Sequence, residues 1–199
     1  FDFFEVNYKI KEYKHLIVSP HYTRTAIYDL IQTEISNTAQ GKTSGIKLKL
    51  NSLSDTKLID KLYAASTAGV KIQLIVRGIC CLIPGVKNMS ENIEVISVVD
   101  KFLEHPRLYI FENDGAPKVY ISSADFMRRN LDTRVEISCP IYDQQIKEEI
   151  LETFDICWSD NVKARCISQK QDNVYRNNNN PKVRSQFALY EFYKNKLEN

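Results

Sequence analysis

The stretch "GIKLKLNSLSDTKLIDKLYAASTAGVKIQLIVRG", residues 45–78, decides the fold. Apolar and basic residues alternate at its start, which is typical of a strand with one solvated face. Apolar residues at helical spacing follow over 54–70, where Ser54 can cap a helix and Gly69 can end it. A second apolar run, 71–78, completes a strand–helix–strand unit, for which right-handed parallel crossovers are the rule. Ligands of such sheets bind at the carboxyl ends of the strands.

The pattern changes on either side of this stretch. Before it, "HLIVSP" (15–20) predicts a short strand, and the residues up to Gly41 predict a helix. After it come four strand-like runs, at 93–99, 107–112, 118–123 and 134–139. The turn "NDGAP" joins the middle two as a hairpin. A long helix from Asp143, a polar loop and a last helix at about 183–197 close the chain. We therefore predict an α/β fold with a mixed, mostly parallel sheet flanked by helices.

The domain organisation follows from the length of 199 residues, which suits one large domain. We expect residues 1–14 to lead in from a preceding domain and residues 15–167 to form the α/β domain. Residues 168–199 would add a polar loop and a C-terminal helix packed on the same domain. Because the chain opens on Phe1 and its first methionine is Met89, we expect it to be a piece of something longer.

The composition is that of an ordinary globular protein, with 43% hydrophobic and 26% charged residues. The formal net charge of +2 gives no argument for nucleic acid, although the last forty residues are locally basic. Five cysteines without a CxxC pair favour reduced thiols and a cytoplasmic location. The chain has no run of 18 apolar residues, and its first residues show neither the apolar core nor the cleavage site of a signal peptide, so we expect no transmembrane segment.

Several short motifs do not carry a function. "AQGKTSG" contains Gly-Lys-Thr, but a phosphate-binding loop needs a glycine where Ser36 stands, and the segment follows a helix. Cys80 and Cys81 are adjacent, so neither a metal clamp nor a redox pair is plausible. We interpret His15 and His21 as surface or capping histidines.

His105 has a spaced neighbourhood. Arg107 lies two residues after it, Glu112 lies seven after it, and "SSAD", which ends at Asp125, follows the hairpin. This is a relaxed form of HxKxxxxD followed by a (G/S)SxN turn, and it resembles the signature of phospholipase D-like phosphotransferases. Arg stands for Lys, Glu for Asp and Asp for Asn, so the short pattern alone leaves open a histidine packed at a strand edge.

Longer stretches resemble the carboxyl-terminal part of the type 1 polyphosphate kinases. They are "LKLNSLSDTKLIDKLYAASTAGVKIQLIVRGICCLIPG", "NIEVISVVDKFLEHPRLYIFEN", "KVYISSADFMRRNLDTRVEISCPI" and "KVRSQFALYEFY". The resemblance implies a phospholipase D-like domain of a larger enzyme. That enzyme reversibly moves the terminal phosphate of ATP to polyphosphate, with Mg²⁺, through a phosphohistidine.

The same resemblance implies roles for particular residues. It assigns nucleotide contacts to Arg77 and His105, and it puts Arg134 and Glu136 beside the phosphate path. The phosphorylated histidine and the magnesium-linked arginines of the family lie upstream, so we expect no metal site in this chain. The expected partners are ATP or ADP, polyphosphate and the upstream domains, and the sequence leaves a second copy of the chain open as a partner. Association with a membrane surface stays open.

Physical chemistry supports these assignments. Phosphoryl transfer needs positioning and cations facing the phosphate oxygens, and a guanidinium fork at Arg77 provides both. His105 can protonate a leaving oxygen or bind a phosphate, and a carboxylate such as Glu136 could hold its tautomer. Arg107 could support the site or face solvent, and Ser123 and Asp125 could support it or end the hairpin strand. The alternative for Arg77 is a surface salt bridge.

Two other functions remain open at this stage. The chain could be a non-catalytic phosphate- or nucleotide-binding assembly domain, since it carries half of a two-half site. It could also be half of a phospholipase D-like nuclease, although Arg107 departs from the HxK pattern. Because the phosphohistidine lies elsewhere, we predict that the isolated chain is inactive.

Overall fold

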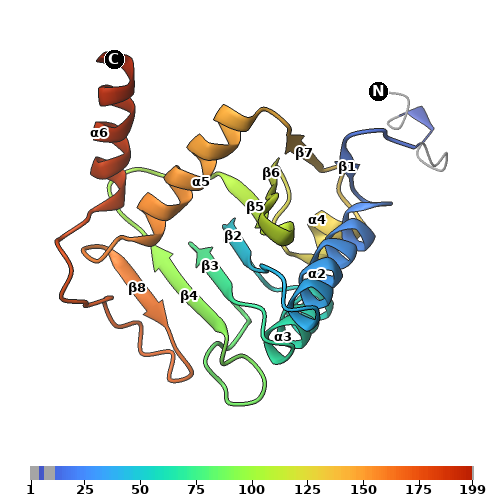
Figure 1. Ribbon diagram of the computed structural model, residues 1–199, viewed down its shortest axis with the longest axis horizontal. Helices are drawn as coiled ribbons and strands as arrows, with labels where there is room; N and C mark the ends of the chain where they lie inside the picture. Colours follow the sequence, from blue (N-terminus) through green and yellow to red (C-terminus); the bar gives the residue numbers. More distant parts are fainter. Residues whose placement is uncertain (1–4, 7–11, 199) are drawn as a thin grey trace.

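The computed structural model describes residues 5–6 and 12–198 (Figure 1). Most of the expected 1–14 lead-in therefore lies outside the described residues. The strands are β1 (Ile17–Val18), β2 (Ile46–Leu50), β3 (Ile72–Val76), β4 (Ile93–Val98), β5 (Arg107–Phe111), β6 (Lys118–Ser122), β7 (Ile137–Ile141) and β8 (Ala164–Ile167). The helices are α2 (Thr23–Ala39), α3 (Thr56–Thr67), α4 (Arg128–Asp132), α5 (Gln144–Trp158), α6 (Ser185–Glu198) and the short 3₁₀ helix η1 (Asn113–Gly115).

The described residues build one eight-stranded sheet in the order β1-β7-β6-β5-β2-β3-β4-β8. The prediction of a mixed sheet flanked by helices is confirmed. Only two of its seven neighbouring pairs, β2 with β3 and β3 with β4, are parallel, so the sheet is less parallel than the sequence suggested. The short turn between β5 and β6 forces antiparallel pairing of these two strands, because parallel neighbours need a long crossover. β1 lies at the far edge beside β7, so α2 crosses the sheet instead of joining two adjacent strands.

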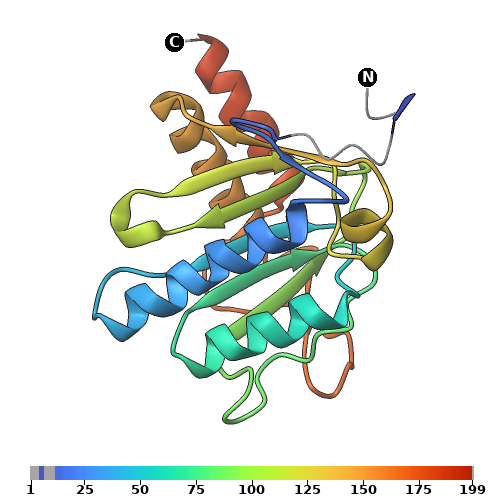
Figure 2. The same ribbon diagram turned by 90° about the vertical axis from the view of Figure 1, so that its right-hand side faces the viewer.

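The sheet is covered on both faces. Helices α2 and α3 lie side by side on one face (Figure 2), where Ile31 and Leu62 pack against Leu48 and Leu74 in the larger apolar core. Helix α5 covers the other face through a smaller apolar core that includes Phe154. Lys47 and Lys49 of β2 point to this second face, where they contact α5. The prediction that one face of this strand is solvated is therefore wrong.

The ends of α3 show how local chemistry sets an element. Asp55, not Ser54, is the N-cap, and its side chain accepts a hydrogen bond from the Leu58 backbone. Gly69 follows the helix at φ +96°, a conformation that favours glycine and stops the helix as predicted.

Three parts of the chain differ from the sequence-based expectation. The strand predicted at 134–139 is β7 at 137–141, so Arg134 and Glu136 precede it. Helix α4 and the edge strand β8 were not predicted, since both are short.

The last helix is present as α6, which projects from the body in Figure 1 and packs its base near α5. None of the helices formed by the described residues is long and apolar enough to cross a membrane.

Candidate functional site

The residues singled out from the sequence meet at one edge of the sheet. The carboxyl ends of β3 and β6 and the amino ends of β5 and β7 share this edge, because β5 and β7 run in the opposite direction. In Figure 2 it is the edge beside α4, opposite the hairpin tip. The residues gathered there are Arg77, His105, Arg107, Ser123, Asp125, Arg134 and Glu136.

Arg107 and Asp125 form a nearly buried ion pair. Their side chains are 11% and 8% exposed, and Arg107 Nη2 donates to Asp125 Oδ2 at 2.9 Å. Asp125 Oδ1 also accepts the backbone N–H groups of Asn51 at 2.8 Å and Ser52 at 3.1 Å. Arg107 therefore does not face solvent, and Asp125 does more than end a hairpin strand. The pair joins β5 to the end of β2.

His105 is exposed and lies against this pair. Its ring nitrogens Nε2 and Nδ1 are 3.2 and 3.4 Å from Arg107 Nη2 and Nη1. Among the described residues, no hydrogen bond joins His105 to Glu136, so the expected use of that carboxylate to hold the histidine tautomer is not observed. The ring is oriented by Arg107, which Asp125 holds in turn.

Glu136 has other partners. One oxygen accepts from the Ser123 hydroxyl, and the other accepts from Asn130 Nδ2 at 2.6 Å. Ser123 Oγ in turn accepts from the Ile137 backbone at 3.1 Å. The sequence analysis did not single out Asn130. The only indication of its role was a polar side chain between two predicted strands. Together these residues fix the segment that carries Arg134.

Arg77 and Arg134 carry the guanidinium groups that remain available. Arg77 Nη1 donates to the Glu104 carbonyl at 3.0 Å, which brings it next to His105. In the part of the chain that the structure describes, neither arginine forms an ion pair, so the surface salt bridge considered for Arg77 is absent. Arg134 is exposed at the same edge. Most of their N–H donors are thus free to face an anion.

A buried polar cluster beneath the edge was also missed. Lys49 of β2, whose side chain is 10% exposed, pairs with Glu104 and donates to Cys157 Sγ at 3.1 Å. Burial raises the pKa of the Cys157 thiol, so the sulfur is a thiol at neutral pH. Three buried polar atoms, Asn51 Nδ2, Glu104 Oε1 and Ser185 Oγ, have no hydrogen-bond partner among the described residues, and these three residues line one space of about 10 Å³ beside this cluster. The only indication of this cluster in the sequence was Lys49 itself, a charged residue within a predicted strand.

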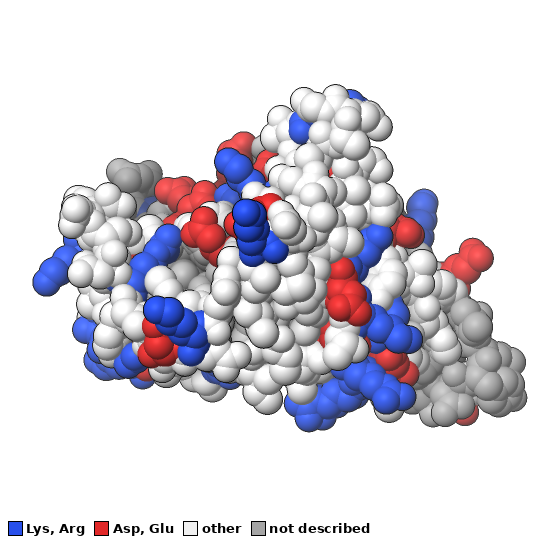
Figure 3. All heavy atoms as spheres, turned by 90° about the horizontal axis from the view of Figure 1, so that it is seen from below, with Lys and Arg blue, Asp and Glu red and all other residues white. Residues whose placement is uncertain are grey.

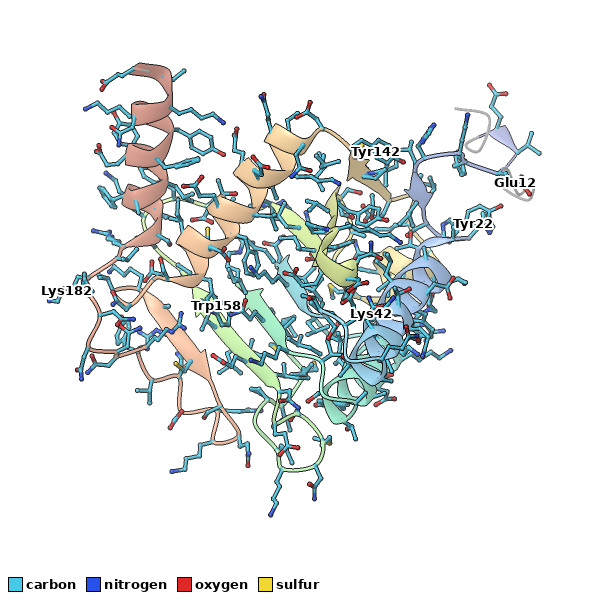
Figure 4. All side chains as sticks on the ribbon, in the orientation of Figure 1. Glu12, Tyr22, Lys42, Tyr142, Trp158 and Lys182 are labelled. Carbon is cyan, nitrogen blue, oxygen red and sulfur yellow. The ribbon has the colours of Figure 1, made fainter. Side chains whose placement is uncertain are left out.

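Two other features lie away from this edge. Glu112 follows β5 at the opposite end of the strand from His105, so the carboxylate of the relaxed motif is not at the site. Lys42 of the Gly-Lys-Thr segment, labelled in Figure 4, pairs with Asp114 in η1 at 3.4 Å, also at that opposite end. The phosphate-loop interpretation therefore has no structural support.

The charges outside the site are mixed. Figure 3 shows acidic and basic side chains interspersed on the face seen from below, with wide uncharged areas between them. In the basic tail, Arg176 lies over the Trp158 ring at 5.0 Å, and Arg184 is paired with Asp100. Figure 4 places Trp158 at the end of α5, beside the strands β4 and β8. Much of the basic charge thus has a structural partner.

The fold defines the class of protein. The structure of Nuc from Salmonella typhimurium, a phospholipase D family member, matches with a TM-score of 0.55 at 16% identity, over 77% of this chain and 96% of that chain. At that identity the likeness shows the fold alone. The chain has a phospholipase D-like fold, as predicted.

Sequence comparisons give the family. The model of the family described as "Polyphosphate kinase C-terminal domain 2" matches residues 16–186, so the chain belongs to the polyphosphate kinase family. Polyphosphate kinase from Vibrio parahaemolyticus is 49% identical over 196 residues, which are 98% of this chain and 28% of that protein. The crystal structure of polyphosphate kinase from Porphyromonas gingivalis matches with a TM-score of 0.92 at 43% identity, over 96% of this chain and 29% of that chain. The chain thus spans less than a third of the length of these relatives.

Proposed function

We propose that this chain is the C-terminal catalytic domain of an enzyme that reversibly transfers the terminal phosphate of ATP to polyphosphate. The observation that carries the proposal is that Arg77, whose guanidinium has no carboxylate partner among the described residues, and the exposed ring of His105 lie at the same edge of the sheet. Glu104 joins the two, since its carbonyl accepts from Arg77 and His105 is the next residue. This pair lies at the sheet edge where ligands of α/β folds bind.

The proposed chemistry uses a histidine outside this chain as the nucleophile. The bond between the γ-phosphorus of ATP and its bridging oxygen breaks, a phosphorus–nitrogen bond forms, and ADP leaves with the bridging oxygen. A terminal oxygen of polyphosphate then attacks the phosphorus and releases the histidine. In this chain, Arg77 and Arg134 face the phosphate oxygens with guanidinium forks, and His105 gives a proton or hydrogen bond to the leaving oxygen.

The remaining site residues position two of the three ligand-facing groups, His105 and Arg134. Arg107 is held by Asp125 and orients His105. Glu136 and Ser123 fix the turn after Arg134. We propose that these four residues position the site without contacting the phosphates.

Mg²⁺ would take its protein ligands from outside this chain. The described residues hold no group of three or more His, Cys, Asp or Glu side chains placed to bind a metal ion. The carboxylates at the edge already accept hydrogen bonds from Arg107, Ser123 and Asn130. The residues present therefore do not fit a magnesium site.

The test uses the complete polypeptide and labelled ATP. We expect Arg77→Ala and His105→Gln each to slow polyphosphate synthesis by about 10²-fold or more, because a donor to developing charge is lost. Arg77→Lys should recover part of the rate, since it restores the charge without the fork. Lys71→Ala, at the opposite edge of the sheet, is the control and should leave the rate unchanged.

Other outcomes would point elsewhere. Wild-type rates in Arg77→Ala and in both His105→Gln and His105→Ala would contradict the assignment. Nucleotide binding without turnover in the complete polypeptide would favour an assembly domain, and cleavage of DNA would favour a nuclease. We also expect the isolated chain to retain no label from ATP, so a labelled chain would contradict an upstream phosphohistidine.

A further inference from the structure

We propose that Lys49, Arg184 and Gln186 form a clamp that sets the position of His105 by holding the 99–106 segment. The three residues come from the middle of the sheet and from the base of α6, and none of them touches His105 itself. They would act as positioning residues. The inference rests on the proposed function, because a clamp on this segment matters for the rate only if His105 acts on the phosphates.

The 99–106 segment cannot be placed by burial. It joins β4 to β5 and contains no helix or strand. Its large apolar side chains point outward, with Val99, Phe102 and Leu103 67%, 57% and 81% exposed. Burial of such groups would normally fix a loop, and here they contribute little. The position of the segment must come from specific polar contacts.

The base of α6 supplies two of these contacts. Arg184 Nε and Nη2 donate to the two oxygens of Asp100, each at 2.7 Å. Gln186 uses both ends of its amide on Phe102: Oε1 accepts from the backbone N–H at 2.9 Å, and Nε2 donates to the carbonyl at 2.8 Å. Two-point contacts of this kind fix orientation as well as distance. Both partners lie 84 residues earlier in the chain.

Lys49 supplies the third contact from inside the sheet. Its ammonium pairs with the Glu104 side chain, while the Glu104 carbonyl accepts from Arg77. A charged lysine in a central strand costs free energy that a leucine at the same position would not, and it is tolerated because it is paired. Glu104 is thereby held from two sides, directly before His105.

The base of α6 is itself anchored. Asp160 Oδ2 accepts the Ser185 backbone N–H at 2.7 Å, and its Oδ1 accepts the backbone N–H groups of residues 162, 163 and 164 at 3.0, 2.7 and 2.9 Å. Beyond this base the helix runs outward (Figure 1) and is held by other contacts, such as the ion pair of Lys196 with Glu149 of α5, while the buried residues of α6, Ser185 and Gln186, lie at its base. The clamp is thus tied to the core and does not depend on the outer turns of α6.

The consequence for catalysis is a loss of rate without a loss of binding. A misplacement of a reacting group by about 1 Å can cost on the order of 10²-fold in rate. Gln186→Ala frees one of three contacts, so we expect kcat to fall by about 10-fold. The KM for ATP should change by less than about 3-fold, because Arg77 directly follows β3 and Arg134 lies in the 123–137 segment, neither of which Gln186 holds.

The experiment compares two α6 variants of the complete polypeptide. Gln186→Ala removes the contact with the 99–106 segment, and Lys196→Ala removes another α6 contact, the ion pair with Glu149 of α5. We expect faster hydrogen exchange at residues 100–105 and a lower kcat in Gln186→Ala alone, at an unchanged Tm. Gln186→Glu keeps the acceptor for the Phe102 N–H, so its kcat should lie between wild type and Gln186→Ala. Arg184→Met, which frees Asp100, should act in the same direction as Gln186→Ala.

Three results would overturn the clamp. One is wild-type exchange and kcat in Gln186→Ala; another is faster exchange with unchanged kcat, which would show that the segment does not position His105. The third is an equal loss of kcat and Tm in Gln186→Ala and Lys196→Ala, which would show a merely structural role for α6. If His105→Gln itself runs at the wild-type rate, the proposed function fails, and hydrogen exchange still decides whether the segment is clamped.

Discussion

Two segments carry the site, and they are held in different ways. The 123–137 segment is tied to the core: the backbone N–H groups of Ser54 and Asp55 both donate to the Phe126 carbonyl at 2.9 Å, and the Phe126 side chain is fully buried. The 99–106 segment lies on the surface and is held by polar side chains of other elements, those of Lys49, Arg184 and Gln186. One segment is part of the core, and the other is placed by a few polar side chains. The first can supply rigid geometry, whereas the second can be adjusted by changes far from the site.

The largest effect should come from breaking the core-bound segment at Asp125. Asp125→Ala leaves the Arg107 guanidinium buried without its partner and frees two backbone N–H groups, so we expect a loss of about 3–5 kcal/mol in the free energy of unfolding. Denaturant unfolding of this chain measures it. Asp125→Asn keeps an acceptor for the backbone and should lose less. A loss below about 1 kcal/mol in Asp125→Ala would show that the pair does not hold the segment.

An intermediate effect is expected at the anchor of the second segment, Asp160. Burial by itself raises the pKa of this carboxyl, but hydrogen bonds from the Ser185 and Lys163 backbones outweigh it, and the pKa lies below its ordinary value of 3.8. A carboxyl with a lowered folded pKa stabilises the fold above its unfolded pKa, and this stabilisation is lost as the pH falls through the folded pKa. Asp160→Asn should therefore cost about 1–3 kcal/mol at neutral pH.

The pH dependence supplies the control for this variant. The deficit of Asp160→Asn relative to wild type should shrink as the pH falls below about 4, because protonation removes the same charge from the wild type. Unfolding measured at neutral pH and at pH 3 checks this. A deficit that is constant with pH would show that the negative charge of Asp160 contributes nothing.

The smallest effect should come from the outer side chain of the second segment. Phe102→Ala should change the free energy of unfolding by less than about 0.5 kcal/mol, because the ring is 57% exposed and the clamp holds the backbone of this residue. The matched variant is Phe126→Ala, which removes a buried ring whose centroid lies 5.1 Å from that of Tyr109. It should lower the free energy of unfolding by about 3–5 kcal/mol. Similar losses of unfolding free energy in Phe102→Ala and Phe126→Ala would show that the two segments are held in the same way.

Much of the architecture could be read from periodicity. The stretch 45–78 predicted β2, α3 and β3 with their order and direction, and the turn after Glu112 predicted the β5–β6 hairpin. These elements are set by contacts between near neighbours in the chain, which leave a repeating apolar pattern. The same pattern placed Arg77 at the carboxyl end of a strand, whereas only the family resemblance joined it to His105.

The tertiary structure decided which strands are neighbours and which charges are buried. β8 is a short edge strand that no local pattern announces, and although the run 15–20 predicted β1, nothing local indicated that its partner would be β7, far away in the sequence. The alternation in "IKLKL" suggested solvated lysines, yet α5 covers them and Lys49 pairs with Glu104. Asp125 likewise reads as a turn residue until β5 brings Arg107 beside it. Local propensity acts over a few residues, whereas these ion pairs exist only because distant segments pack together and exclude water from the charges.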